Sequence, residues 1–217
     1  MLNCNYKGPV VLVEGLDLAG KSTLASFLKK RLAEHYEVVS YSRNAMTEGN
    51  DFAAFADKQR KNPDVPLSET CPLFMAAHLY DALQFKSPEP NAVHLQDSSW
   101  LRTLAFNRVR DNQAFLPLLE RIARVQPKFD LSLYLTASIA VRQNRVVQRE
   151  GEEASENDHS DYLVYSDPDL FKRNDEMLLL TTQSYCDCVE VIDTSELSQE
   201  DVQKAAMSAL RKYGIIV

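Results

Sequence analysis

The sequence lacks the features that mark membrane, secreted and repeat proteins. No apolar run approaches the roughly 18 to 20 residues that a membrane span requires. The first residues lack the charged region, apolar stretch and cleavage site of a signal peptide. The chain also contains no internal repeat, coiled coil or low-complexity tract. We therefore expect a cytoplasmic, globular protein that does not enter a membrane.

Cysteine and histidine are scarce, with four of each in 217 residues. Cys186 and Cys188 form a C-x-C pair, but no second pair with zinc-ligand spacing accompanies it. This favours reduced, mostly buried thiols over a zinc site. The chain also lacks an excess of basic over acidic residues, because its formal net charge is -7. That balance argues against nucleic acid as the main partner, so any phosphate site must be a local basic pocket.

What is present has the proportions of an ordinary globular domain, with 45% hydrophobic and 25% charged residues. A chain of this length can build one sizeable core and is short for two, so we expect a single domain over residues 1–217.

Five short apolar segments alternate with helical patterns along the chain. Strands are expected at residues 10–13, 37–41, 92–96, 131–135 and 189–193. Helices are expected at residues 21–36, 52–60, 67–85, 100–110, 115–125, 139–149, 167–185 and 198–212. Segment 151–166 is acidic, polar and almost without large aliphatic side chains, so we expect it to be mobile. The alternation predicts a three-layer α/β fold, in which helices flank a five-stranded parallel sheet.

The most informative motif is Gly15-x-x-x-x-Gly20-Lys21-Ser22, between the first strand and the first helix. Strand, loop and helix in this order are the context of a P-loop, which binds polyphosphates through backbone N–H groups. Lys21 can reach the β- and γ-phosphates, and the Ser22 hydroxyl can ligate Mg²⁺. The alternative is a glycine-rich turn that binds no phosphate. The candidate nucleotide-binding residues are Gly15, Leu16, Asp17, Leu18, Ala19, Gly20, Lys21, Ser22 and Thr23.

Four segments in the same order carry a family resemblance. Residues 13–24 look like the P-loop of the thymidylate kinase group of P-loop nucleoside monophosphate kinases, including its acidic residue. Asp97 with 104–107 (Leu-Ala-Phe-Asn) resembles that family's Asp-Arg-Tyr segment and downstream Ala-Tyr-Gln. Residues 129–135 resemble the strand before its lid, and 191–194 its final strand. The resemblance implies a P-loop kinase fold with a lid, the cofactors ATP and Mg²⁺, a place in nucleotide biosynthesis, and a homodimer through the central helices.

Two carboxylates are candidates for the site. Asp97 ends the third expected strand and is a candidate Mg²⁺ ligand, direct or through water; a carboxylate that caps the next turn is the alternative. In the resembling family the P-loop acid contacts the sugar of the acceptor. Asp17 is therefore a candidate for binding an acceptor hydroxyl, with a solvent-facing loop acid as the alternative.

The P-loop carries no extra cation, so the chain resembles family members whose lid supplies one. The lid is expected at about residues 142–166, and Arg142, Arg145 and Arg149 are the candidate catalytic arginines, with Arg145 first. Their spacing places them on neighbouring faces of one helix. The alternative is a solvated basic face paired with nearby glutamates.

The acceptor side departs from the family. Ser98 and Leu79 stand where members that act on thymidine monophosphate usually carry arginine. A buried phosphate needs compensating cations, so two expected partners are missing. Arg43 matches the arginine of the family's Arg-Glu-Pro loop, and since ligands bind beyond the carboxyl ends of parallel strands, it should face the same crevice as Gly15 and Asp97.

Other residues could complete the acceptor site. Arg102 and His78 could replace the lost cations. Phe74 and Phe106 could wall a planar base while Asn107 reads its edge, although a plain core role suits both phenylalanines equally well.

These observations support three hypotheses. The first is a Mg²⁺-dependent kinase that moves the γ-phosphoryl group of ATP to a nucleotide-type acceptor, with thymidine monophosphate as the best single guess. The second keeps the donor site but uses a nucleoside or another small hydroxyl compound as acceptor. The third is a nucleotide-binding protein without transferase activity, which the intact Lys21, Ser22 and Asp97 oppose.

Overall fold

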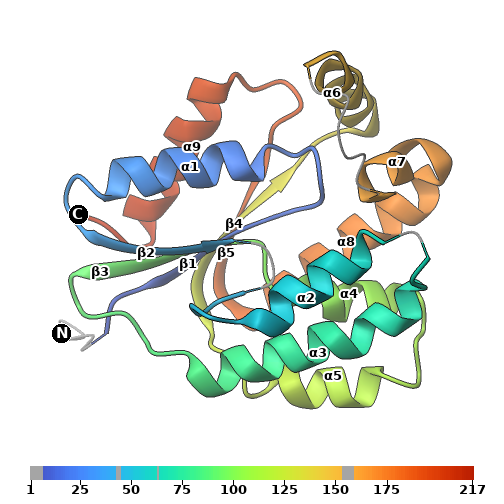
Figure 1. Ribbon diagram of the computed structural model, residues 1–217. Helices are drawn as coiled ribbons and strands as arrows, with labels where there is room; N and C mark the ends of the chain where they lie inside the picture. Colours follow the sequence, from blue (N-terminus) through green and yellow to red (C-terminus); the bar gives the residue numbers. More distant parts are fainter. Residues whose placement is uncertain (1–6, 43–44, 63, 153–158) are drawn as a thin grey trace.

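The computed structural model describes residues 7–42, 45–62, 64–152 and 159–217 (Figure 1), without the side chains of residues 42, 67–68, 149–152 and 159–162. Arg43, the side chain of Arg149 and residues 153–158 of the expected lid therefore lie outside what the structure describes.

Five parallel strands form the central sheet, as the alternating pattern predicts. They are β1 (Val10–Glu14), β2 (Glu37–Ser42), β3 (Ala92–Asp97), β4 (Phe129–Thr136) and β5 (Cys186–Asp193), in the spatial order β2-β3-β1-β4-β5. Every residue of β1 is buried, and β3 and β4 are buried over most of their length. Strands covered on both faces need apolar side chains on both, which explains why they read as continuous apolar runs.

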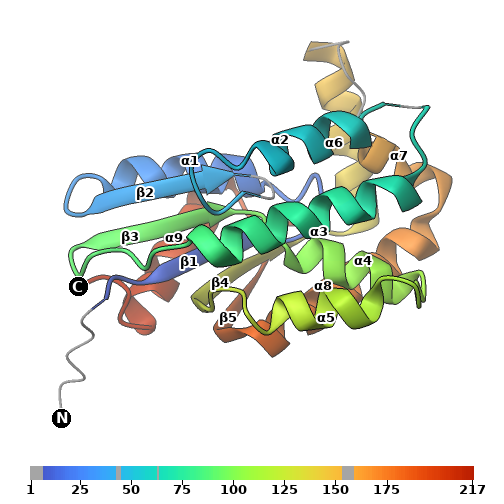
Figure 2. The same cartoon turned by 60° about the horizontal axis from the view of Figure 1, so that its bottom comes forward.

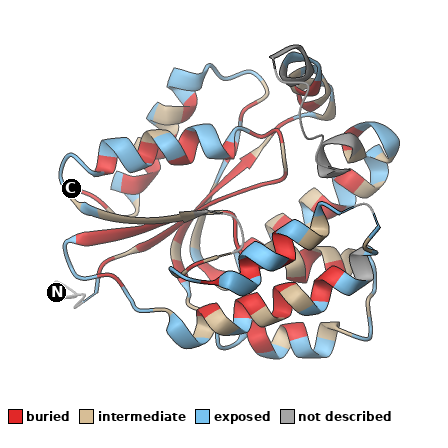
Figure 3. Cartoon of the chain, in the orientation of Figure 1, coloured by how far each residue is buried: buried red, intermediate tan, exposed pale blue. Residues whose placement is uncertain are grey.

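Helices cover both faces of the sheet (Figure 1 and Figure 2). One layer consists of α1 (Lys21–Leu32) and α9 (Gln199–Lys212); the other consists of α2 (Asp51–Arg60), α3 (Leu67–Gln84), α4 (Leu101–Val109), α5 (Leu116–Ala123) and α8 (Pro168–Tyr185). Each layer has its own apolar cluster against the sheet. Figure 3 shows the buried residues along the strands and on the inward faces of the helices. The three-layer α/β prediction is confirmed.

The segment expected to be mobile contains regular structure. α6 (Ile139–Glu152) runs further than expected, and α7 covers His159–Ser166. The reason is the pair Leu163 and Val164, the few aliphatic residues of the segment: Val164 is fully buried, and Leu163 packs against the same core cluster. Gln143 of α6 also donates to the carbonyl of Val164 at 3.1 Å. Residues 159–166 thus form a helix with two side chains packed into the core, and the expected mobility of the segment stays a prediction.

The topology brings distant segments to one edge of the sheet. In register, Val13 of the central strand β1 lies opposite Asp97 in β3 and Leu133 in β4. The loop after β1 therefore starts beside the end of β3, and α6 and α7 stand at the same end of the sheet (Figure 1). Among the described helices, none combines the length and apolar character that crossing a membrane requires.

Candidate active site

The loop between β1 and α1 has the backbone that its glycines predict. Gly15 has a φ of 133°, and a Cβ there would lie 2.0 Å from the carbonyl oxygen of Leu135, so only glycine fits. Gly20 has a φ of 95°. Leu18 also has a positive φ, 66°, which is strained for a residue with a side chain. The loop therefore holds a conformation that its own residues do not all favour.

The nine candidate nucleotide-binding residues differ in exposure. Asp17 is half-buried, and the exposed residues are Gly20, Ser22 and Thr23. The buried ones are Gly15, Leu16, Leu18, Ala19 and Lys21.

Lys21 begins α1 and turns back over the loop. Its Nζ donates to the carbonyl of Leu16 at 2.9 Å and lies 3.5 Å from the Asp17 carboxylate. Burial, with a contribution from the nearby Arg102 charge, lowers the pKa of Lys21 to about 8. A buried ammonium with a lowered pKa gains from a neighbouring anion, which is the relation expected of a phosphate-binding lysine.

Ser22 and Asp97, the two candidate metal ligands, line one pocket of about 370 Å³. A hydroxyl and a carboxylate are the hard oxygen donors that suit Mg²⁺, which commonly takes its other ligands from water and substrate phosphates. The described residues include no cluster of three or more acidic, histidine or cysteine side chains able to hold a metal. Directly after Asp97, Ser98 has a φ of 63°, a second strained residue beside the loop.

Glu14, the last residue of β1, lies beneath the loop with no exposed surface. Its carboxylate accepts from the N–H of Gly15, from the N–H and hydroxyl of Ser99, and from Nε of Arg102. Sequence reasoning missed this residue. The available signal was an acid at the end of a strand that is otherwise wholly apolar.

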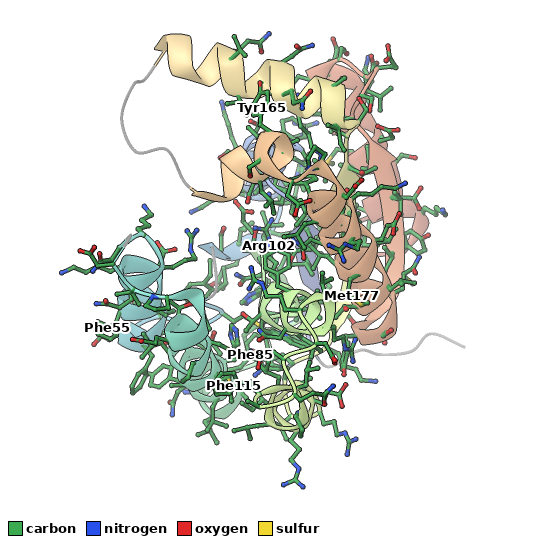
Figure 4. The ribbon with its side chains drawn as sticks, turned by 90° about the vertical axis from the view of Figure 1, so that its right-hand side faces the viewer. Phe55, Phe85, Arg102, Phe115, Tyr165 and Met177 are labelled. Carbon is green, nitrogen blue, oxygen red and sulfur yellow. The ribbon has the colours of Figure 1, made fainter. Side chains whose placement is uncertain are left out.

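Arg102 reaches the loop from α4. Its Nε lies 2.9 Å from Glu14, one Nη lies 3.2 Å from Asp17, and the other donates to the carbonyl of Gly15. Although burial acts to lower it, the carboxylates of Asp17 and Glu14 raise the pKa of Arg102. In Figure 4 the residue lies near the centre of the molecule, between α2 and α3 on one side and α7 and α8 on the other. The structure thus brings this expected acceptor residue to the P-loop.

Arg142 points inward from α6 with no exposed surface. Its Nη1 donates to the carbonyl of Asp17 at 2.6 Å, its Nε to that of Ala137 at 2.8 Å, and its Nη2 to the Asp175 carboxylate at 3.1 Å. The guanidinium also lies 5.0 Å from the ring centre of Phe171. The alternative of a solvated basic face is therefore wrong for Arg142.

Arg145 reaches the next carbonyl of the loop. Its Nη1 donates to Leu18 at 2.7 Å and to the hydroxyl of Thr194 at 3.1 Å, while Nη2 donates to the Thr194 carbonyl at 3.0 Å. Sequence reasoning missed Thr194 and Asp175. Asp175 had a signal: it follows Phe171 by four residues and precedes Leu178 by three, so it shares the buried face of α8.

Two expected acceptor residues, His78 and Asn107, form hydrogen bonds within the helical layer. His78 is buried, its Nε2 lies 2.8 Å from the Thr103 hydroxyl, and burial lowers its pKa to about 3. A neutral imidazole cannot replace a lost cation at physiological pH. The Asn107 amide donates to the Thr103 carbonyl at 2.7 Å and accepts from Asn112 at 2.8 Å.

The two expected aromatic walls lie in or against the core. Phe74 is buried, with its ring centre 6.3 Å from that of His78. Phe106 is partly buried and packs against the core cluster on the α4 side of the sheet. Their places agree with the plain core role, and an additional contact with a ligand stays a prediction.

No protein-family model matches the chain, and no curated protein matches it in sequence. Solved structures do match. Thymidylate kinase from Candida albicans aligns with a TM-score of 0.68 at 15% identity, covering 96% of this chain and 93% of its own. Thymidylate kinase from Ehrlichia chaffeensis aligns with a TM-score of 0.62 at 13% identity, covering 95% and 98%. The chain therefore has a thymidylate kinase-like fold over nearly its whole length.

Proposed function

We propose that this protein, on its thymidylate kinase-like fold, is an ATP- and Mg²⁺-dependent phosphotransferase that moves the γ-phosphoryl group to a nucleotide-type acceptor. The observation that carries the proposal is the convergence of three groups at one edge of the sheet: a buried Lys21 above the P-loop, and Ser22 and Asp97 in one pocket beside it. Phosphoryl transfer needs charge to be neutralised and an acceptor to be positioned, and these groups serve the first need.

The donor-side roles follow from the chemistry of each group. Lys21 binds the β- and γ-phosphates, and the N–H groups of the loop bind phosphate oxygens. Ser22 and Asp97 hold Mg²⁺, which supplies further positive charge to the transferred group. Asp17 accepts a hydrogen bond from an acceptor hydroxyl, a position that its ion pairs with Arg102 and Lys21 fix.

For the acceptor, thymidine monophosphate remains the first candidate because of the fold. A second candidate, a nucleoside or other small hydroxyl compound, is favoured by one observation. Arg102, one of the two residues expected to replace the lost cations, already forms ion pairs with Glu14 and Asp17. An acceptor phosphate would have to compete with both carboxylates, whereas a neutral hydroxyl would not.

We also propose that the protein is a homodimer formed through α2 and α3. Among the side chains that the structure describes in these helices, four large apolar ones are exposed: Phe52, Phe55, Leu79 and Leu83. Large apolar side chains exposed on neighbouring helices are typical of surfaces that contact another protein.

The direct test is an ADP-release assay with purified protein, ATP and Mg²⁺, run against a panel of nucleoside monophosphates, nucleosides and sugars. Turnover with thymidine monophosphate is expected. Turnover with a neutral hydroxyl compound and with no monophosphate would reject the nucleotide acceptor. Tight ATP binding without turnover on any acceptor would favour the non-catalytic alternative.

A lysine pair on α1 tests the donor site. Lys21→Ala should abolish transfer, because it removes the buried cation next to the loop. Lys30→Ala is the matched control, since Lys30 is exposed on the same helix. Activity of Lys21→Ala at a near wild-type rate would overturn the donor-site assignment.

A further inference from the structure

Each backbone carbonyl of the P-loop from residue 15 to residue 19 accepts a hydrogen bond from a side chain, and four of the five donors are cations. The pairs are Gly15 with Arg102, Leu16 with Lys21, Asp17 with Arg142, Leu18 with Arg145, and Ala19 with the hydroxyl of Thr194. Three of the cations come from α4 and α6. Elements distant in the sequence therefore hold this short loop from outside.

These contacts set the direction of the loop's N–H groups. The described residues have no cis peptide bond, and a trans peptide points its carbonyl and the following N–H to opposite sides. Carbonyls that turn toward the cations therefore turn the next N–H groups away from them. Within the described part of the chain, the N–H groups of Leu16, Leu18, Ala19 and Gly20 donate to no protein group. A row of such groups is an arrangement that binds anions.

Leu18 is the strained residue of the loop, because its φ of 66° is disfavoured for a residue with a Cβ. Such a conformation persists only where its surroundings enforce it. Arg142 bonds the carbonyl of the peptide before Leu18, and Arg145 bonds the carbonyl of the peptide after it. The two arginines thus fix both peptide planes that flank the strained residue.

Arg142 can hold the Asp17–Leu18 peptide plane because its own guanidinium is held in place. Its guanidinium is fully buried, and the Asp175 carboxylate binds its Nη2. The same carboxylate accepts from the hydroxyls of Tyr134 at 2.7 Å and Thr136 at 3.2 Å, so α8 and β4 anchor the pair. With so little freedom, the guanidinium acts on the backbone of Asp17 and not on a ligand directly.

We infer that Arg142 is a positioning residue: anchored by Asp175, it holds the Asp17–Leu18 peptide in the orientation that turns the Leu18 N–H toward bound phosphates. The inference rests on the proposed function, because only a phosphate-binding loop needs this orientation. It assigns Arg142 a role in nucleotide binding through the loop backbone, separate from the direct catalytic role expected of a lid arginine.

The test replaces the arginine while keeping its charge. In Arg142→Lys one ammonium cannot reach three acceptors that a planar guanidinium bonds together. The probes are ATP and inorganic triphosphate, with binding measured by calorimetry. Arg108→Lys is the matched control, because Arg108 also ties a helix to α8, through Thr181, and has a second partner in Glu120.

We expect Arg142→Lys to weaken the binding of both probes by about tenfold, the equivalent of one well-oriented hydrogen bond. Equal loss for both probes indicates an effect on phosphate and not on the base. In the transferase assay the KM for ATP should rise by a similar factor, with less than about twofold change in the KM for the acceptor. Arg108→Lys should bind both probes like the wild type.

Asp175→Asn provides a second, milder variant. Arg142 then keeps its size and loses its charged anchor, so triphosphate binding should weaken by about threefold, within the range for one hydrogen bond to a charged group. A folded Arg142→Lys or Asp175→Asn protein with wild-type triphosphate affinity would overturn the inference. A wild-type protein that binds neither ATP nor triphosphate would instead overturn the proposed function.

Discussion

Arg102 and Glu14 form an ion pair beneath the P-loop, with 2.9 Å between Nε and the carboxylate. Glu14 has no exposed surface, so this arginine and the donors of Gly15 and Ser99 are its polar partners in place of water. Water cannot replace a lost partner at such a depth without rearrangement. The pair therefore ties the end of β1 to α4 and supports the loop from below.

Removal of Arg102 should be costly for stability. Arg102→Ala leaves the Glu14 carboxylate buried without its cation, which is expected to lower the free energy of unfolding by about 3–5 kcal/mol. Arg108→Ala should cost only about 1 kcal/mol or less, because the Glu120 partner of Arg108 is exposed. Urea unfolding followed by circular dichroism measures both. Equal losses in the two variants would show that Glu14 does not depend on Arg102.

The lowered pKa of Lys21 predicts proton uptake on ligand binding. In the free protein its pKa is about 8, so a large part of the lysine is neutral at pH 8.5. A bound polyphosphate favours the charged form and raises this pKa, so binding at pH 8.5 should take up a fraction of a proton, and affinity should fall as the pH rises through 8. Calorimetry of triphosphate binding in two buffers with different ionisation enthalpies measures the uptake. Lys30→Ala should leave it unchanged, and absence of uptake between pH 7.5 and 9 would contradict the prediction.

Gly15 should tolerate no side chain. In Gly15→Ala the new methyl carbon would lie 2.0 Å from the Leu135 carbonyl oxygen, and the φ of 133° is one that residues with a Cβ rarely adopt. The loop must shift, so we expect loss of triphosphate binding together with a lower melting temperature. Gly214→Ala is the control, because Gly214 also has a positive φ, 69°, but no atom lies within 4 Å of its added Cβ. Wild-type triphosphate affinity in Gly15→Ala would contradict this account.

The sequence predicts the fold well because each strand carries its own signal. Strands covered on both faces must be apolar, and the helices between them must be amphipathic, so order and type follow from local patterns. β5 begins at Cys186, three residues before its expected start, because Cys186 and Cys188 pair with Phe129 and Leu131 of β4. Such pairing is a tertiary effect that the local pattern around Asp187 does not reveal.

In the candidate site, too, local motifs were predictable from the sequence and tertiary contacts were not. Lys21 and Ser22 follow from a motif whose residues are adjacent in the chain, and Asp97 follows from its place at a strand end. The partner of Arg142 does not follow, because Asp175 lies 33 residues away on another helix. The burial of His78 does not follow from the sequence either. Helical spacing alone does not show that α4 packs over His78 and places Thr103 next to its imidazole.

The last prediction concerns the exposed apolar stripe of α3. Leu79 and Leu83 lie one turn apart and are 43% and 73% exposed. Single exposed leucines are common, but here the adjacent α2 also exposes two large apolar side chains, Phe52 and Phe55. If two copies pair through these helices, burial of Leu83 contributes to the dimer, and a charge at that position opposes it.

Leu83→Lys should therefore shift the protein toward the monomer in sedimentation equilibrium, with at least a tenfold weaker association, because a lysine head group at a closed apolar contact costs more than about 1.4 kcal/mol. Leu180→Lys is the matched control, because Leu180 is 57% exposed and belongs to α8, which is not one of the two helices of the proposed interface. The control should sediment like the wild type, since its charge meets only water. A wild type that stays monomeric up to high concentration would reject the dimer, and equal weakening by both substitutions would move the interface away from α3.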